Sequence, residues 1–115
     1  MDKTYCLQRA EKIASHYGLE SQMSVAQEEC AELIQAISKL RRAYAAGTDT
    51  PEKRLKCVVA RGNVDEEMAD VTNMMMQLTH LLNNDKMVDF WLDQKLERTL
   101  AEMQKEVPHV ASQDT

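Results

Sequence analysis

Residues 27–42 read QEECAELIQAISKLRR, and both the composition and the spacing of this segment predict a long α-helix. Its Ala, Leu, Glu, Gln, Lys and Arg side chains lose little rotamer freedom in a helix, and neither Gly nor Pro interrupts it. Ser21 or Ser24 can serve as its N-cap, and we expect it to continue to Gly47. The predicted buried stripe, spaced by three or four residues, is Ala26, Cys30, Leu33, Ile37, Leu40 and Tyr44.

Similar signals predict helices on both sides of this central helix. Before it, we expect a helix from about Thr4 to Tyr17 that stops at Gly18. After it, we expect a short helix from Thr50-Pro51 to about Ala60, broken by Arg61-Gly62, and a long helix opened by Asn63 and Glu66. A turn at Asn83-Asn84-Asp85 should precede a last long helix, which carries apolar residues from Met87 to Met103 and ends before Pro108.

These elements predict an all-α fold, a helical bundle of three long and one or two short helices. The stripe of the third long helix follows steps of four and three residues, which indicates an antiparallel helical partner. Its members are Val64, Met68, Val71, Met75, Leu78 and Leu82. We expect one domain over residues 1–107, a polar C-terminal tail over residues 108–115, and completion of the bundle by a homodimer or homotetramer.

Composition narrows the possible functions. A net charge of -5 argues against binding to a nucleic acid polymer, because little positive charge is present to neutralise a phosphate backbone. Cys6, Cys30 and Cys57 are widely spaced and form neither a disulfide framework nor a zinc motif. The N-terminal segment is not a secretory signal, and no segment has the length of a membrane span, so we expect a cytoplasmic protein without a membrane partner.

Four carboxylates lie beside the predicted apolar stripes. Glu29 and Glu32 are one turn apart on the central helix, and Glu67 and Asp70 repeat this arrangement on the next long helix. If the two helices pack through their apolar stripes, the four acids converge near one point, where repulsion and desolvation disfavour them unless a cation is bound. Oxygen ligands of this kind suit Mg²⁺, with Mn²⁺ as a substitute. The alternative is that both pairs are solvated helix faces with surface ion pairs.

The segments QEECAELIQAISKLRR and NVDEEMADVTNMMMQL together resemble the MazG-like branch of the all-α nucleoside triphosphate pyrophosphatase superfamily. The family signature is an ExxE motif followed by an ExxD motif, which Glu29, Glu32, Glu67 and Asp70 match. The resemblance covers roughly residues 17–100. It implies an enzyme that hydrolyses a nucleoside triphosphate to the monophosphate and pyrophosphate, with Mg²⁺ held by these four acids and one glutamate activating the attacking water.

The resemblance also suggests residues that contact the substrate. Lys39 lies in the same helical row as the first acid pair, and Lys95 lies in a KLER segment similar to that of the family; both are expected to meet phosphate. Arg42 and Arg98 are weaker candidates. The Gln22 amide could read a base edge, and Asn73 could contact the sugar or hold a ligand carboxylate in place. Each of these side chains could instead be an ordinary surface, capping or supporting residue.

Two other interpretations remain open on the sequence. One is a relative that hydrolyses a phosphoribosyl-nucleotide in histidine synthesis, which shares the fold and the acids. The other is a helical interaction module without enzymatic activity, whose acids bind a structural cation or face solvent. The identity of the base and the choice between ribose and deoxyribose cannot be predicted from the sequence.

Overall fold

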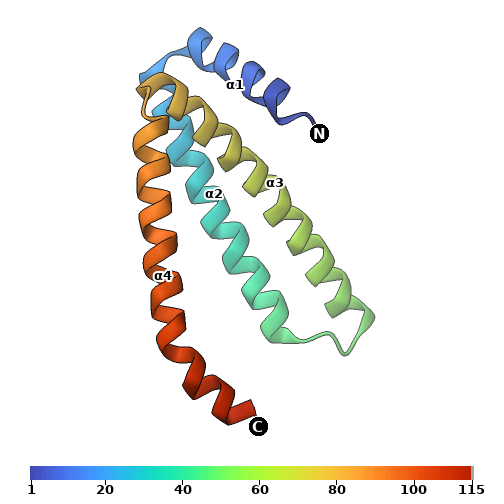
Figure 1. Ribbon diagram of the computed structural model, residues 1–115. Helices are drawn as coiled ribbons and strands as arrows, with labels where there is room; N and C mark the ends of the chain where they lie inside the picture. Colours follow the sequence, from blue (N-terminus) through green and yellow to red (C-terminus); the bar gives the residue numbers. More distant parts are fainter. Residues whose placement is uncertain (115) are drawn as a thin grey trace. The chain divides into compact units, whose positions relative to one another are not determined.

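The computed structural model describes residues 1–114, with side chains described for residues 1–106. The described chain forms four α-helices: α1 (Lys3–Tyr17), α2 (Leu19–Ala46), α3 (Pro51–Leu82) and α4 (Asp85–Asp114) (Figure 1). The predicted all-α class is therefore confirmed for this part of the chain. None of the helices found in it combines the length and the apolar character that crossing a membrane requires.

The chain forms two compact units, Met1–Asn83 and Asn84–Thr115. In the first unit, α2 and α3 run antiparallel as a long hairpin, and α1 packs mainly against α3 (Figure 1). The second unit is α4 with its preceding turn.

The helix α4 continues past Pro108 to Asp114, so its predicted end was wrong. A proline within a helix removes one backbone hydrogen bond and can bend the helix without ending it. The side chains of the predicted tail and Thr115 lie outside the described part.

Gly18 separates α1 from α2 and explains why α2 begins earlier than the serine N-caps predict. Its φ of 89° is a left-handed value that glycine adopts without strain. Its N–H donates to Ala14 O at 2.8 Å, and its carbonyl already accepts from Gln22 N at 3.1 Å. One residue therefore ends one helix and starts the next, so Ser21 and Ser24 lie inside α2.

The helix α3 is continuous, so the predicted break at Arg61-Gly62 and the predicted cap at Asn63 were wrong. Its start is as predicted, because Thr50 Oγ1 accepts from Lys53 N at 3.2 Å and Pro51 occupies the first turn. A glycine inside a helix costs only about 1 kcal/mol relative to alanine. Buried residues before and after it, among them Ala60 and Met74, anchor both halves of α3, and this packing outweighs the glycine penalty.

Replacing Gly62 by alanine should therefore stabilise the protein by about 0.5–1 kcal/mol, because Gly62 is exposed and helical and an added Cβ meets nothing within 4 Å. The matched variant is Gly47→Ala, which should destabilise it because Gly47 has a φ of 93°. Denaturant unfolding of both variants measures the difference. A loss of stability in Gly62→Ala would contradict a continuous α3.

Small and polar side chains, rather than the predicted apolar stripes, form the contact between α2 and α3. The buried residues there are Gln22, Ala26 and Ala36 of α2 and Cys57, Ala60, Met74 and Gln77 of α3. All six stripe residues of α3 are exposed or half-buried, so the predicted contact face of α3 was wrong. On α2, Ala26 is buried as predicted, whereas Ile37 and Tyr44 are exposed. The buried residues of α3 lie one position before the predicted stripe. The contact face is therefore rotated by about 100° toward the row that contains Asp70 and Asn73.

Candidate functional site

The four acids singled out in the sequence lie together midway along the α2–α3 hairpin. Each of Glu29, Glu32, Glu67 and Asp70 offers a carboxylate oxygen, and these oxygens all lie within 4.8 Å of one another. Each helix supplies two acids spaced by three residues, so both members of a pair project from the same face. The rotated helix contact places the acids on the surface between the two helices.

Two of the carboxylate oxygens lack the partner that a buried polar atom normally has. Oε2 of Glu29 and Oε2 of Glu67 are both shielded from solvent and accept no hydrogen bond within the described part of the chain. Buried acceptors are almost always satisfied, because an unsatisfied one loses its hydration without replacement. A divalent cation between the two helices would coordinate these oxygens. The donor set therefore fits a hard, oxygen-binding ion such as Mg²⁺ and offers none of the nitrogen or sulfur ligands typical of zinc sites.

The pKa values of the two half-buried glutamates show the same crowding. The pKa of Glu29 is raised from 4.5 to about 7, first by partial burial and then by the charges of Asp70 and Glu32. Burial also raises the pKa of Glu67, followed by repulsion from Glu32 and Asp70. A carboxylate whose charged form is disfavoured to this extent is stabilised when a cation binds beside it.

A buried chain of amides lies beside the acids, nearer to α1. Gln22 Nε2 donates to Gln77 Oε1 at 2.7 Å, and Gln77 Nε2 donates to Asn73 Oδ1 at 2.9 Å. Ser21 Oγ donates to Gln22 Oε1 at 3.1 Å, which fixes the orientation of the first amide. Because an amide has two N–H donors and two acceptor lone pairs, each of the three retains hydrogen-bonding capacity for a ligand.

The amides and two of the acids line one cavity of about 340 Å³. Ile13 and Tyr17 of α1 contribute to the lining of this cavity, and Met74 forms an apolar wall. The remaining lining residues are Ser21, Gln22, Val25, Glu29, Asp70, Asn73 and Gln77. A pocket with apolar walls, a few oriented amides and adjacent carboxylates is typical of a small-molecule site.

Gln77 is the member of this site that sequence reasoning missed. It is only 1% exposed, and it joins Gln22 to Asn73 across the helix contact. A signal was present in the sequence, because Asp70, Asn73 and Gln77 recur at helical spacing on one face of α3. The apolar stripe one residue later has a similar spacing and predicts a different buried face.

The residues predicted to contact phosphate lie in two different parts of the chain. Lys39 and Arg42 line a different cavity, farther along α2 toward the α2–α3 loop. Lys95 and Arg98 belong to α4, the second unit, and their contact with phosphate stays a prediction. Gln22 and Asn73, by contrast, both line the cavity next to the acids, and their contact with a base or sugar stays a prediction.

Ser15, His80 and Glu11 form a serine–histidine–acid arrangement that chain order alone did not suggest. Ser15 Oγ lies 3.0 Å from His80 Nε2, and Glu11 Oε2 lies 4.0 Å from His80 Nδ1. Both Ser15 and His80 are exposed, and they line none of the cavities described for this chain. The arrangement joins α1 to α3 at the surface, whereas acyl transfer takes place in a water-excluded site.

No protein-family model matches the chain, and no curated protein or solved structure is significantly similar to it. The chemistry of the site therefore has to support any functional conclusion.

Proposed function

We propose that this protein is a Mg²⁺-dependent nucleoside triphosphate pyrophosphohydrolase, which releases a nucleoside monophosphate and pyrophosphate. The observation that carries the proposal is the position of Glu29 and Asp70, which belong to the four-carboxylate cluster and also line the amide cavity. A phosphate group bound at the cluster would thus have its organic part in the cavity. The resemblance of the two acidic motifs to the MazG-like branch supports the same reaction.

The four acids would hold the metal in this proposal, and Mg²⁺ would supply charge neutralisation of the phosphate oxygens and a lowered pKa of bound water. Glu29 and Glu67 contribute the shielded oxygens, whereas Glu32 and Asp70 are exposed. The exposed carboxylates remain within reach of solvent water. One of them would accept the proton of the water that attacks the phosphoanhydride bond.

The amide cavity would bind the nucleoside part. Its volume of about 340 Å³ is near the lower end for ligand pockets and suits a nucleobase better than a large ligand. The Gln22–Gln77–Asn73 chain offers oriented donors and acceptors of the kind that pair with a base edge. Met74 and Tyr17 offer flat or adaptable apolar contact for a base face.

The protein would act as a homo-oligomer. Apolar residues on the α2–α3 hairpin remain exposed, and several of them border a groove of about 760 Å³. Met23, Ile34, Met75 and Leu78 line this groove. Burial of such a surface against another copy is favourable in proportion to its apolar area.

Product analysis of a panel of canonical and modified nucleoside triphosphates tests the proposed reaction. Purified protein should convert at least one of them to monophosphate and pyrophosphate in Mg²⁺, and EDTA should abolish the reaction. Ion-resolved chromatography separates this outcome from release of inorganic phosphate. Absence of turnover in folded, Mg²⁺-saturated protein would favour the helical cation-binding module instead.

A further inference from the structure

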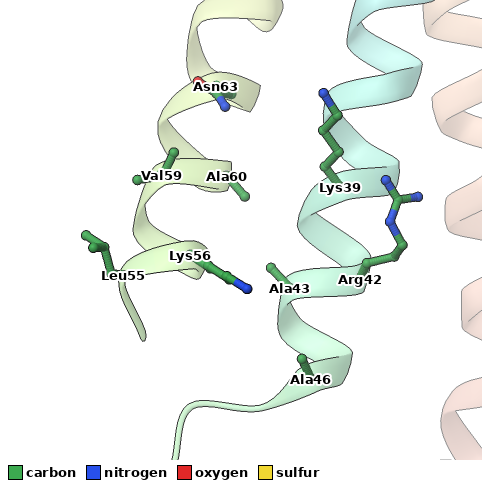
Figure 2. Close-up of a pocket in the computed structure, with 9 residues that line it drawn as sticks. All are labelled: Lys39, Arg42, Ala43, Ala46, Leu55, Lys56, Val59, Ala60 and Asn63. Carbon is green, nitrogen blue, oxygen red and sulfur yellow. The ribbon is translucent and has the colours of Figure 1, made fainter. Parts of the chain in front are cut away.

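A second cavity, of about 540 Å³, lies between α2 and α3 near their connecting loop. It contains three basic residues and no acidic one; the lining residues are Lys39, Arg42, Ala43, Ala46, Leu55, Lys56, Val59, Ala60 and Asn63. Figure 2 shows Lys56 directed from α3 into the gap and Lys39 extending along the side of α2 that faces α3, with Arg42 on the other side of α2. We call this cavity the basic groove.

The cations of the basic groove are available for a ligand. Within residues 1–83, neither Lys39, Arg42 nor Lys56 has an acidic partner at salt-bridge distance. Lys53, one turn before the groove, shows the contrast, because its Nζ lies 3.0 Å from Asp49 Oδ1. Cations that line one cavity without an acidic partner leave a positive potential there, which favours a bound anion.

The basic groove continues the row of functional side chains along the hairpin. Lys39 follows Glu32 by seven residues, which is two helical turns or about 10 Å along nearly the same face. Asn63 precedes Glu67 by one turn on the opposite helix. The Lys39 side chain points back toward the N-terminal end of α2, as helical side chains do, and so toward the acids (Figure 2).

Three regions therefore follow one another along the hairpin: the amide cavity, the carboxylate cluster and the basic groove. A nucleoside triphosphate has the same order of chemistry, with a base at one end, a reacting phosphoanhydride in the middle and anionic phosphates at the other end. The carboxylates repel these terminal phosphates, and the two ammonium groups of the basic groove, just beyond them, offset that repulsion.

We infer that the basic groove binds the pyrophosphoryl end of the substrate, and that the leaving pyrophosphate rests there after cleavage. This inference rests on the proposed function for the orientation of the substrate, although binding of the anion does not require catalysis. Lys39 and Lys56 would then select for the number of phosphate groups, because a nucleoside diphosphate bound at the amide cavity and the carboxylate cluster extends less far into the basic groove.

Calorimetric titration with inorganic pyrophosphate and tripolyphosphate in EDTA tests the site without turnover. The variants are Lys39→Gln/Lys56→Gln and, as a charge-matched control, Arg41→Gln and Lys3→Gln combined, since neither Arg41 nor Lys3 lines the groove. The first double variant should lose about tenfold or more in affinity, the control about twofold or less, and Lys39→Arg/Lys56→Arg should retain binding. Circular dichroism and melting establish that every variant is folded.

Turnover adds a second readout. The double Gln variant should raise KM for a triphosphate with a smaller change in kcat, and should leave KM for the matching diphosphate nearly unchanged. Equal pyrophosphate affinity in wild type and the double Gln variant would overturn the inference even if the protein hydrolyses nucleotides. Lost pyrophosphate binding in a protein that hydrolyses no nucleotide would support the anion site and overturn the proposed function.

Discussion

Glu67→Gln is expected to lose at least about 100-fold in Mg²⁺-dependent turnover, because even the groups that orient metal ligands cost 10- to 100-fold when removed. Glu67 supplies one of the two shielded, unpaired oxygens of the cluster, so its amide replacement removes a charge where a cation would be most enclosed. The same variant should lose the rise in melting temperature that Mg²⁺ produces in wild type. Initial rates and melting curves with and without Mg²⁺ measure both effects.

The metal-free form of the same variant should change in the opposite direction. In EDTA, the pKa of Glu67 is raised chiefly by partial burial and then by the like charges of Glu32 and Asp70. Replacing it by neutral glutamine relieves that repulsion, so the metal-free variant should melt above metal-free wild type. A variant that is more stable in EDTA but unresponsive to Mg²⁺ distinguishes a cation site from general damage to the fold.

Glu66→Gln and Glu28→Gln provide matched controls. Both residues are exposed, and each is adjacent in sequence to a cluster member but rotated by about 100° on its helix. Each control makes the same chemical change and removes the same charge, yet should retain the Mg²⁺ response. If Glu66→Gln and Glu67→Gln lose it equally, the cation is bound diffusely by the acidic surface rather than by the four-acid cluster.

The acidic cluster was predictable from sequence because it depends on local spacing. Two acids three residues apart on one helix must share a face, and a second such pair on an antiparallel neighbour can face the first. The structure brings together all four predicted acids, with Gln22 and Asn73 in the adjacent cavity. The acids converge although the contact on α3 uses the row one residue before the predicted stripe, because Glu67 and Asp70 belong to that row.

The choice of the contact face was not predictable in the same way. Met68, Val71 and Met75 form a convincing apolar stripe, yet the helix contact uses the row one residue earlier, with Met74 and Gln77 buried. Alanines on the facing helix allow close approach, and the amide pair satisfies its own buried hydrogen bond. The hydrophobic pattern of a single helix does not reveal these contributions to stability, which come from pairs of residues on facing helices.

The prediction of a helix break at Gly62 was wrong for a related reason. A local glycine penalty of about 1 kcal/mol is smaller than the gain from packing both halves of a long helix against a neighbour. At Gly18 and Gly47, by contrast, the chain does reverse, and both glycines have positive φ. Glycine marks a helix end where the backbone needs a left-handed conformation, and only tertiary packing decides which glycine has one.

Mg²⁺ affinity is expected to fall steeply as the pH decreases below neutral. The pKa of Glu29 is raised to about 7 by partial burial and by Asp70, Glu32 and Glu67, all of them acids that face it within the cluster. Protons therefore compete with the cation for this ligand, and each pH unit below 7 should weaken Mg²⁺ binding by up to about tenfold through Glu29 alone. Calorimetric Mg²⁺ titrations at several pH values give the slope.

The metal-free protein should show the opposite trend in stability. The pKa of Glu29 is about 7 in the folded chain and near 4.5 when unfolded, so the folded state binds the proton more tightly between these values. Its contribution to stability is fully present below pH 4.5 and is lost as the pH rises through 7. In EDTA, the chain should thus melt higher at about pH 5.5 than at about pH 8, and saturating Mg²⁺ should remove this preference.

Glu29→Gln separates this effect from the titration of the other acids. An uncharged side chain at that position cannot take up the proton, so the dependence of metal-free melting on pH should flatten, whereas Glu28→Gln should retain it. Melting in EDTA that instead rises between the same two pH values would mean that Glu29 ionises as an ordinary surface acid. The shielded oxygens would then need no cation, and the cluster would be a solvated helix face.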